Sequence, residues 1–205
     1  VPGFEPLRTK AFLLMGLDYW HQAEPTAALD AVRQQLTADL ASAYVTSAHE
    51  GWHWFEDRLT YGNAHLSQAL LGGSQRRVGL ASLAWLCTVL DVDGAMSLIG
   101  SNGFYAEGGA RAIYDQQAID AQATLGACLA AFNQTGNNRF RHWASMAYAW
   151  FMGRNIGRRS MIDATTGGCY DGLTPTGVNT NQGAESLLAW LLAQEDMMEA
   201  GLLSA

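Results

Sequence analysis

Residues 115–154 read DQQAIDAQATLGACLAAFNQTGNNRFRHWASMAYAWFMGR, and this stretch decides which fold the sequence predicts. Its second half repeats apolar residues at the three- and four-residue spacing of an amphipathic helix, namely Phe140, Trp143, Ala147, Trp150 and Phe151. We expect helices over about 115–134 and 138–154, joined by only Thr135 to Asn137. Because so short a link requires antiparallel neighbours, the stretch predicts a helical hairpin.

The same spacing recurs along the rest of the chain. It predicts further helices over about 5–21, 26–45, 63–72, 75–91 and 182–201. No segment shows the sustained two-residue alternation of a half-buried strand. The predicted fold class is therefore all-α, with repeated antiparallel helical hairpins in a single domain over residues 1–205.

The connections between these helices alternate between short and long. The short ones run from His21 to Pro25, from Gly72 to Ser74 and from Thr135 to Asn137, and the long ones cover about 46–62, 92–114 and 155–181. In an up-and-down arrangement, all three long connections then fall at one end. Long loops of compact, Gly-rich and aromatic composition are more often functional than structural linkers. We therefore expect the functional site at the long-loop end.

Composition excludes several classes of protein. Hydrophobic residues make up 49% and charged residues only 15%, which argues against disorder. The net charge is −7, the 12 basic residues are 11 Arg plus Lys10, and no basic run exceeds two residues, so we expect no nucleic-acid partner. No window of about 18 continuous apolar residues is present, so we expect no membrane span.

The cysteines and the first residues bear on where the protein resides. Cys87, Cys128 and Cys169 are odd in number and lack CxxC spacing, so a disulfide framework or thiolate zinc site is not expected. A reducing, cytoplasmic compartment fits best. The chain starts Val1-Pro2-Gly3-Phe4-Glu5, which has neither an initiator Met nor signal-peptide character. We therefore expect a processed chain or part of a longer protein.

The long connections and the helix starts beside them concentrate carboxylates, amides and aromatic residues. Two carboxylates can share acid and base work on a glycosidic bond. Aromatic faces stack on sugar rings, and amides bind sugar hydroxyls. The candidate catalytic residues are Glu56, Asp57, Asp171 and Glu185. The candidate substrate-binding residues are Trp54, Tyr61, Asn63, Asp115, Gln116, Gln117, Asn179, Asn181 and Gln182.

Each carboxylate also has a purely structural interpretation. Asp115 could cap its helix, and Asp171 with Gly172 could form a turn. Glu185 could simply stabilise the first turn of its helix through the dipole. Glu56 follows Trp52, Trp54 and Phe55, so it could belong to a buried ion pair.

Residues 49–53 read HEGWH and match the zinc-protease pattern H-E-x-x-H. That chemistry needs both histidines on one helical face, with Glu50 acting on zinc-bound water. Gly51 disfavours a helix by roughly 1 kcal/mol relative to Ala. A third ligand is also missing nearby, since Glu107 would have to come from a distant loop. We therefore expect no metal, and keep the zinc site only as an alternative.

A set of motifs resembles a known family. They are Trp54-Phe55-Glu56, Leu59-Thr60-Tyr61-Gly62-Asn63-Ala64, Asp115-Gln116-Gln117, residues 150–155 (WFMGRN), residues 166–173 (TGGCYDGL) and residues 179–186 (NTNQGAES). Together they resemble the helical domain found C-terminal to the nucleotide-sugar-dependent domain in some bacterial glycosyltransferases. That domain is similar to the six-hairpin α/α-toroid glycosidases and to related sugar epimerases. The resemblance covers about Trp52 to Leu192, most of the chain.

The resemblance implies an α/α toroid with a sugar-binding mouth at the long-loop end. The chain has fewer predicted helices than a complete six-hairpin toroid, so it would be part of one, a reduced arc, or one completed by association. It also implies an oligosaccharide or sugar ligand and a glycosyltransferase catalytic domain in the same longer chain as a partner. No Rossmann fingerprint, P-loop or βα alternation is present, so we do not expect this chain alone to transfer sugar from a nucleotide donor.

Three functional hypotheses follow. In the first, the chain is a glycosidase-like enzyme without a cofactor, in which Glu56 or Asp57 is the general acid. Asp171 or Glu185 would then be the base or nucleophile. In the second, the same end binds and positions a glycan for a glycosyltransferase without catalysis. In the third, the chain is a zinc hydrolase that uses His49, Glu50 and His53.

Overall fold

The computed structural model describes residues 6–203. Within that range, seven helices lie where the sequence predicts them, with ends that differ by up to a few residues. They are α1 (Leu7–Ala23), α2 (Ala27–Ser47), α3 (Ala64–Ala69), α4 (Arg76–Leu90), α5 (Ala118–Thr135), α6 (Asn138–Phe151) and α7 (Ala184–Glu199). The expected start of the first helix at residue 5 lies outside the described residues.

Local chemistry accounts for several helix ends. The Thr26 hydroxyl accepts the Leu29 N–H at 3.2 Å at the start of α2. The Asn137 side chain accepts the Arg139 N–H at 3.0 Å at the start of α6. Between α5 and α6, Gly136 takes a left-handed conformation with φ of 65°, which glycine adopts without strain. The predicted hairpin of residues 115–154 therefore forms.

Helix α5 is the central helix. It packs against α3, α4, α6 and α7. Its buried positions are mostly small, with Ala118, Ala121, Ala123, Ala127 and Ala131 all inaccessible or nearly so. Small side chains let several neighbours approach one helix, and a helix that is apolar on all sides is typical of a buried position.

The expectation of an all-α toroid is wrong. The structure is mixed α/β, because three small antiparallel sheets form in the long connections. β1 (Arg58–Leu59) pairs with β4 (Tyr105–Ala106), and β2 (Asp91–Val92) pairs with β3 (Ala95–Met96). β5 (Gln116–Gln117), β6 (Gly172–Thr174) and β7 (Gly177–Asn179) form the third sheet. Strands of two or three residues are too short to show a two-residue alternation, and β1, β4, β5 and β6 also depend on partners in separate connections.

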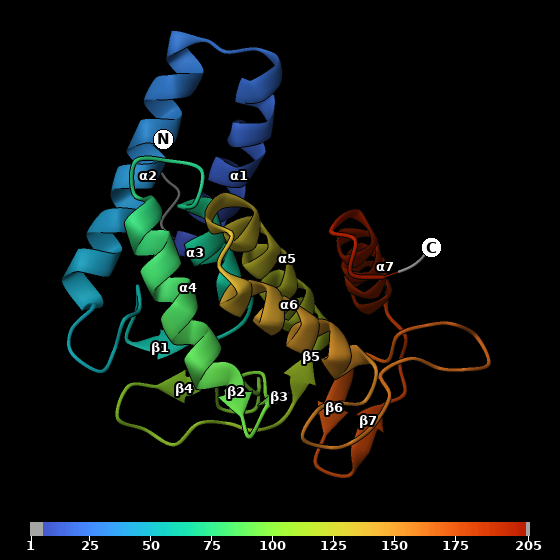
Figure 1. Ribbon diagram of the computed structural model, residues 1–205. Coiled ribbons are helices and arrows are strands. Elements are labelled where there is room, and N and C mark those ends of the chain that lie inside the picture. The colour runs from blue at the N-terminus through green and yellow to red at the C-terminus, as the bar shows by residue number, and fades with distance from the viewer. Residues whose placement is uncertain (1–5, 204–205) are drawn as a thin grey trace.

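These sheets hold the long connections together at one end of the molecule. Pairing of β1 with β4 joins the first long connection to the second, and pairing of β5 with β6 joins the second to the third. Figure 1 shows the strands gathered along the lower edge, below the helices. The predicted meeting of the long connections at one end is therefore observed.

The core is one continuous cluster that runs from α1 to α7. Its largest fully buried side chains include Trp54, Phe55, Trp150 and Phe151, two adjacent pairs that meet edge to face. Cys87 and Cys128 face each other as free thiols with their sulfurs 3.5 Å apart. Within residues 6–203, no helix combines the length and apolar character needed to cross a membrane.

Candidate functional site

A polar cleft of about 810 Å³ opens at the end where the long connections meet. Its walls come from the β5–β6–β7 sheet, from the segment that follows β7, and from the first turn of α7. The lining side chains are mainly hydroxyls, amides and carboxyls, with Ser101 and Asp115 on the side of the second connection. The volume falls within the roughly 300–1,000 Å³ of typical ligand sites.

The sheet that forms one wall depends on a close approach of two backbones. Gln117 pairs with Gly172, and Gln116 pairs with Leu173. A Cβ at position 172 would lie 2.8 Å from the Gln116 carbonyl oxygen, so only glycine fits without a shift of the strand. Leu173 is fully buried, and it fixes this wall to the core.

Asp171 stands where the third connection meets α7. Its Oδ1 accepts hydrogen bonds from the Gly183 N–H and the Ser186 hydroxyl, both at 2.7 Å, and its Oδ2 accepts one from the Asn181 amide. Burial favours a higher pKa for Asp171, but the bonds from Ser186, Asn181 and Gly183 outweigh it and lower the pKa below its ordinary value. The carboxyl therefore remains ionised at neutral pH.

The structure brings five of the sequence-predicted residues together in this cleft. They are Asp115, Gln117, Asp171, Asn179 and Glu185. Glu185 is exposed in the first turn of α7, so its carboxyl is free to meet a ligand. Two further predicted residues brace the wall. Asn181 binds Asp171, and Gln182 donates to Asp163 at 2.9 Å and accepts from the Thr166 hydroxyl at 3.0 Å.

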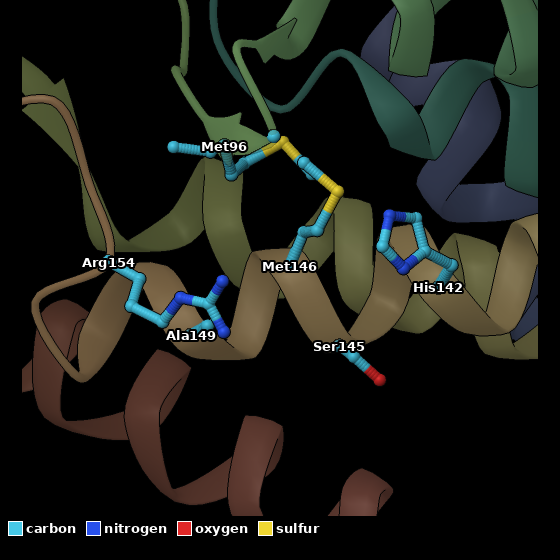
Figure 2. Close-up of a pocket in the computed structure, with 8 residues that line it drawn as sticks. Met96, His142, Ser145, Met146, Ala149 and Arg154 are labelled. Atoms are coloured by element: carbon cyan, nitrogen blue, oxygen red, sulfur yellow. The ribbon is translucent and has the colours of Figure 1, made fainter.

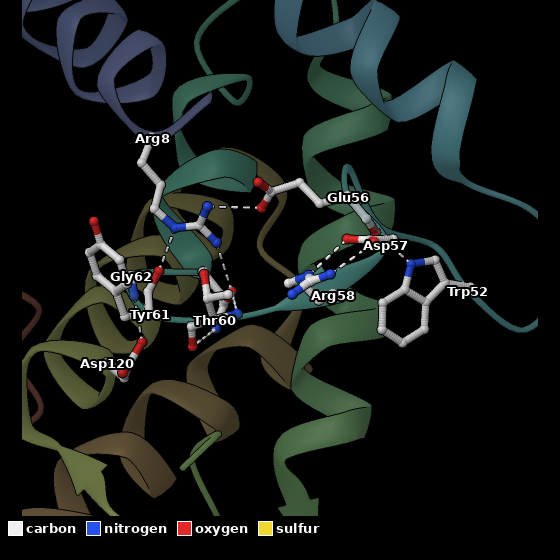
Figure 3. Close-up of polar contacts among 10 residues, drawn as sticks. Arg8, Trp52, Glu56, Asp57, Arg58, Thr60, Tyr61, Gly62 and Asp120 are labelled. Atoms are coloured by element: carbon white, nitrogen blue, oxygen red, sulfur yellow. Dashed lines mark hydrogen bonds and ion pairs between the residues drawn. The ribbon is translucent and has the colours of Figure 1, made fainter. Parts of the chain in front are cut away.

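Four predicted residues do not line this cleft: Glu56, Tyr61 and Asn63 lie in a cluster around Arg8 of α1, and Asp57 lies outside both (Figure 3). Glu56 forms an ion pair with Arg8 at 2.8 Å. The Arg8 side chain also donates to the Tyr61 carbonyl at 2.6 Å and to Asn63 Oδ1 at 3.2 Å. Asp57 points to solvent and pairs only with its neighbour Arg58, at 3.0 Å.

Within this cluster, Asn63 is buried and its side chain closes the 60–63 turn through the Thr60 N–H and carbonyl, both at 2.9 Å. Tyr61 is 52% exposed, with the Arg8 guanidinium 5.4 Å from its ring centroid. The ring is accessible, but the cleft lining does not include it.

The remaining two predicted ligand residues are core residues. Trp54 is 0% exposed and packs against Phe55 and Trp85, so its faces cannot stack on a sugar. Gln116 is also inaccessible, and its Oε1 accepts the Trp150 indole N–H at 2.8 Å. Both therefore hold the scaffold of the long-loop end together.

Sequence reasoning missed Asp120. It is 5% exposed and accepts the Gly62 N–H at 2.7 Å. Burial raises the pKa of Asp120 to about 7, and the Glu185 charge adds to this, whereas the Gly62 and Asn63 amides and the charge of Arg8 act against it. The charge of Arg8 and the charge of Glu185, which lines the cleft, therefore both act on Asp120. Asp120 is the only charged residue of α5, which is the signal that could have found it.

Arg8 was missed as well, for a different reason. Its partners Glu56, Tyr61 and Asn63 lie 48 to 55 residues away in the sequence. Nothing local to α1 marks this arginine, since it occupies the polar position of an ordinary helical turn.

The HEGWH segment does not form a zinc-protease helix. Helix α2 ends at Ser47, and His49 instead pairs through its backbone with Trp52 around Gly51, which has a φ of 87°. His49 Nε2 lies 2.5 Å from Glu107 Oε1. Among residues 6–203, no group of three His, Cys, Asp or Glu side chains is arranged to hold a metal.

Two other features could be mistaken for sites. A cavity of about 120 Å³ lies between β3 and α6, where the side chains of Met96 and Met146 point toward each other beside His142 (Figure 2). It is smaller than ordinary ligand pockets. Near the cleft, burial raises the pKa of the Cys169 thiol to about 12, so this sulfur is not a nucleophile at neutral pH.

No family model matches this chain in a comparison with known protein families, and a search of curated proteins finds no match either.

Proposed function

We propose that the chain is a glycan-binding domain and that the cleft at the long-loop end is its ligand site. The observation that carries this proposal is the lining, in which hydroxyl, amide and carboxyl groups from two connections and one helix converge on about 810 Å³. A sugar presents closely spaced hydroxyls, each a donor and an acceptor. Carboxylates accept hydrogen bonds from these hydroxyls, and side-chain amides can either donate or accept such bonds.

The cleft would bind through hydrogen bonds, with little aromatic stacking. Among residues 6–203 no aromatic side chain lines it, and Trp54 lies in the core. The resemblance of residues 52–192 to a glycosyltransferase-associated helical domain supports the same ligand class. It also suggests that the domain holds a glycan for a glycosyltransferase catalytic domain in the same longer chain.

Binding of oligosaccharides by isothermal titration calorimetry tests the proposal. Gln117→Ala and Asn179→Ala each remove one amide from the lining, and each should weaken binding about three- to tenfold, the usual value of a single hydrogen bond. Asp57→Asn changes a carboxyl outside the cleft and should leave binding unchanged. The site would be refuted if no neutral, amino or acidic oligosaccharide binds saturably. It would also be refuted if both amide variants bind as tightly as the wild type.

A second candidate is glycoside hydrolysis in the same cleft. It is favoured by the carboxyl groups of Asp171 and Glu185, which both line the cleft, because two carboxyl groups can share the acid and base work on a glycosidic bond. Asp171, which its three donors keep ionised, would act as the base or nucleophile, whereas Asp120 is buried and does not line the cleft. Glu56 and Asp57, the acids expected from the sequence, do not line the cleft.

Analysis of reducing ends released from an oligosaccharide panel separates the two candidates. A hydrolase should release products, and Asp171→Asn should abolish their release. Saturable binding without any product would leave the binding domain as the function.

A further inference from the structure

The side chains that line the cleft carry an excess of negative charge. Asp115, Asp171 and Glu185 contribute three carboxyl groups to its lining, to which the described part of the chain adds no lysine, arginine or histidine. Most of the wall is otherwise neutral, made of hydroxyl, amide and backbone groups. The site therefore offers many neutral hydrogen bonds and an excess of negative charge.

The charge on Asp171 is stabilised without a cation. Its partners are the Ser186 hydroxyl, the Asn181 amide and the Gly183 backbone N–H, all of which are neutral. Neutral donors hold a carboxylate in place but leave its net charge intact. A ligand in the cleft therefore meets this charge uncompensated.

Neither Arg8 nor the helix N-termini at the cleft cancel this charge. The Arg8 guanidinium is engaged by Glu56 at 2.8 Å and by two further oxygens, and it does not line the cleft. The N-termini of α5 and α7 each contribute roughly half a positive charge. Two such ends amount to about one charge, against three carboxyl groups.

We infer, building on the proposed glycan-binding function, that the cleft selects sugars with a free, positively charged amino group over N-acetylated or acidic sugars. An ammonium group is a donor only, so it matches carboxylates that have no cationic partner. A uronate or a phosphorylated sugar would instead place a second negative charge among the three already present.

The test compares ligands that differ only at the amino group. Oligomers of glucosamine, N-acetylglucosamine oligomers of the same length and linkage, and oligogalacturonate are titrated into the protein at about pH 6 and low salt. We expect the amine to bind about tenfold more tightly than the acetylated oligomer, the difference between a charge-assisted and a neutral hydrogen bond. This preference should shrink as salt is added, and the uronate should bind most weakly.

Two matched variants test whether a carboxylate in the cleft causes the preference for the amine. Glu185→Gln keeps the shape of a lining side chain but removes its charge, so it should reduce the preference several-fold while binding of the N-acetylated oligomer stays the same. Asp57→Asn removes one negative charge at an exposed position outside the cleft, and it should leave the preference intact.

The outcomes separate this inference from the function on which it rests. Equal binding of the amine and the acetylated oligomer, or tighter binding of the uronate, overturns the charge selection and leaves glycan binding standing. Equal effects of Glu185→Gln and Asp57→Asn also overturn it, because the preference would then reflect only the overall charge of the protein. Absence of binding by every oligomer overturns glycan binding itself.

Discussion

Asp120 makes stability depend on pH in an unusual direction. An unfolded chain ionises this carboxyl near 3.8, whereas the folded protein does so near 7 because the group is buried. Between these values the folded protein binds a proton that the unfolded chain does not. The free energy of unfolding should therefore fall as the pH rises from about 4 to about 7, by at most about 4 kcal/mol at 1.36 kcal/mol for each pKa unit.

Asp120→Asn should remove this dependence, because the amide keeps an acceptor for the Gly62 N–H and cannot ionise. Urea unfolding across this pH range should show the variant gaining stability relative to the wild type as the pH rises. His65 is also buried with a lowered pKa, but it affects both proteins equally. Asp57→Asn is the control at an exposed carboxyl, and an unchanged slope in Asp120→Asn would contradict the assignment.

Ser186 helps to keep the carboxyl group of Asp171 ionised. Its hydroxyl is buried and donates to Asp171 Oδ1 at 2.7 Å. Ser186→Ala removes one of the donors that lower the pKa of Asp171, so this pKa should rise toward its ordinary value. Loss of a hydrogen bond to a charged group should also cost about 1.5–3 kcal/mol of stability.

The carboxyl carbon shift of Asp171, followed by NMR during a pH titration, measures the first effect, and urea unfolding measures the second. Ser145→Ala is the matched control, because that exposed hydroxyl donates only to the Arg141 carbonyl within α6. An unmoved Asp171 titration in Ser186→Ala would show that the other two donors suffice.

At the scale of elements, two glycines should respond to the same substitution in opposite ways. A Cβ at Gly172 would lie 2.8 Å from the Gln116 carbonyl oxygen, so Gly172→Ala should push β6 away from β5 and cost about 1–3 kcal/mol. Gly16 lies within α1, and a Cβ at this position would have open space for 4 Å around it, so Gly16→Ala should gain up to about 1 kcal/mol.

Urea unfolding of the two variants checks the signs, and glycan titration checks the consequence. Gly172→Ala should also weaken binding, since β6 and β7 form a wall of the cleft, whereas Gly16→Ala should leave binding unchanged. Wild-type stability in Gly172→Ala would mean that the β5–β6 contact adapts at no cost.

Helices and strands differ in how well the sequence predicts them. Helices such as α5 and α6 carry several turns of repeated apolar spacing, so their existence could be predicted. The strands could not, because β5 has only two residues and forms by pairing with β6, more than fifty residues later. A local pattern contains no information about such a partner.

At the scale of the whole molecule, the sequence likewise predicts one part of the candidate site and not the other. Alternation of short and long connections correctly placed polar residues at one end, and Asp115, Asp171 and Glu185 do share a cleft there. This alternation does not distinguish residues that face solvent from residues that fold inward, so it predicts ligand binding by Trp54 and Gln116 although both are inaccessible. Burial depends on tertiary contacts, and a loop near a site contributes to the core as well as to the surface.

The hydrogen bond between Gln116 and the Trp150 indole has a consequence for the kinetics of recognition. It ties β5 to α6, and Leu173 of β6 packs into the same core, so one wall of the cleft belongs to the interior scaffold. A ligand would then meet a surface that is already assembled, without waiting for a loop to close. Its association rate should be governed by diffusion and orientation, and differences in affinity among related ligands should arise chiefly from how long each remains bound.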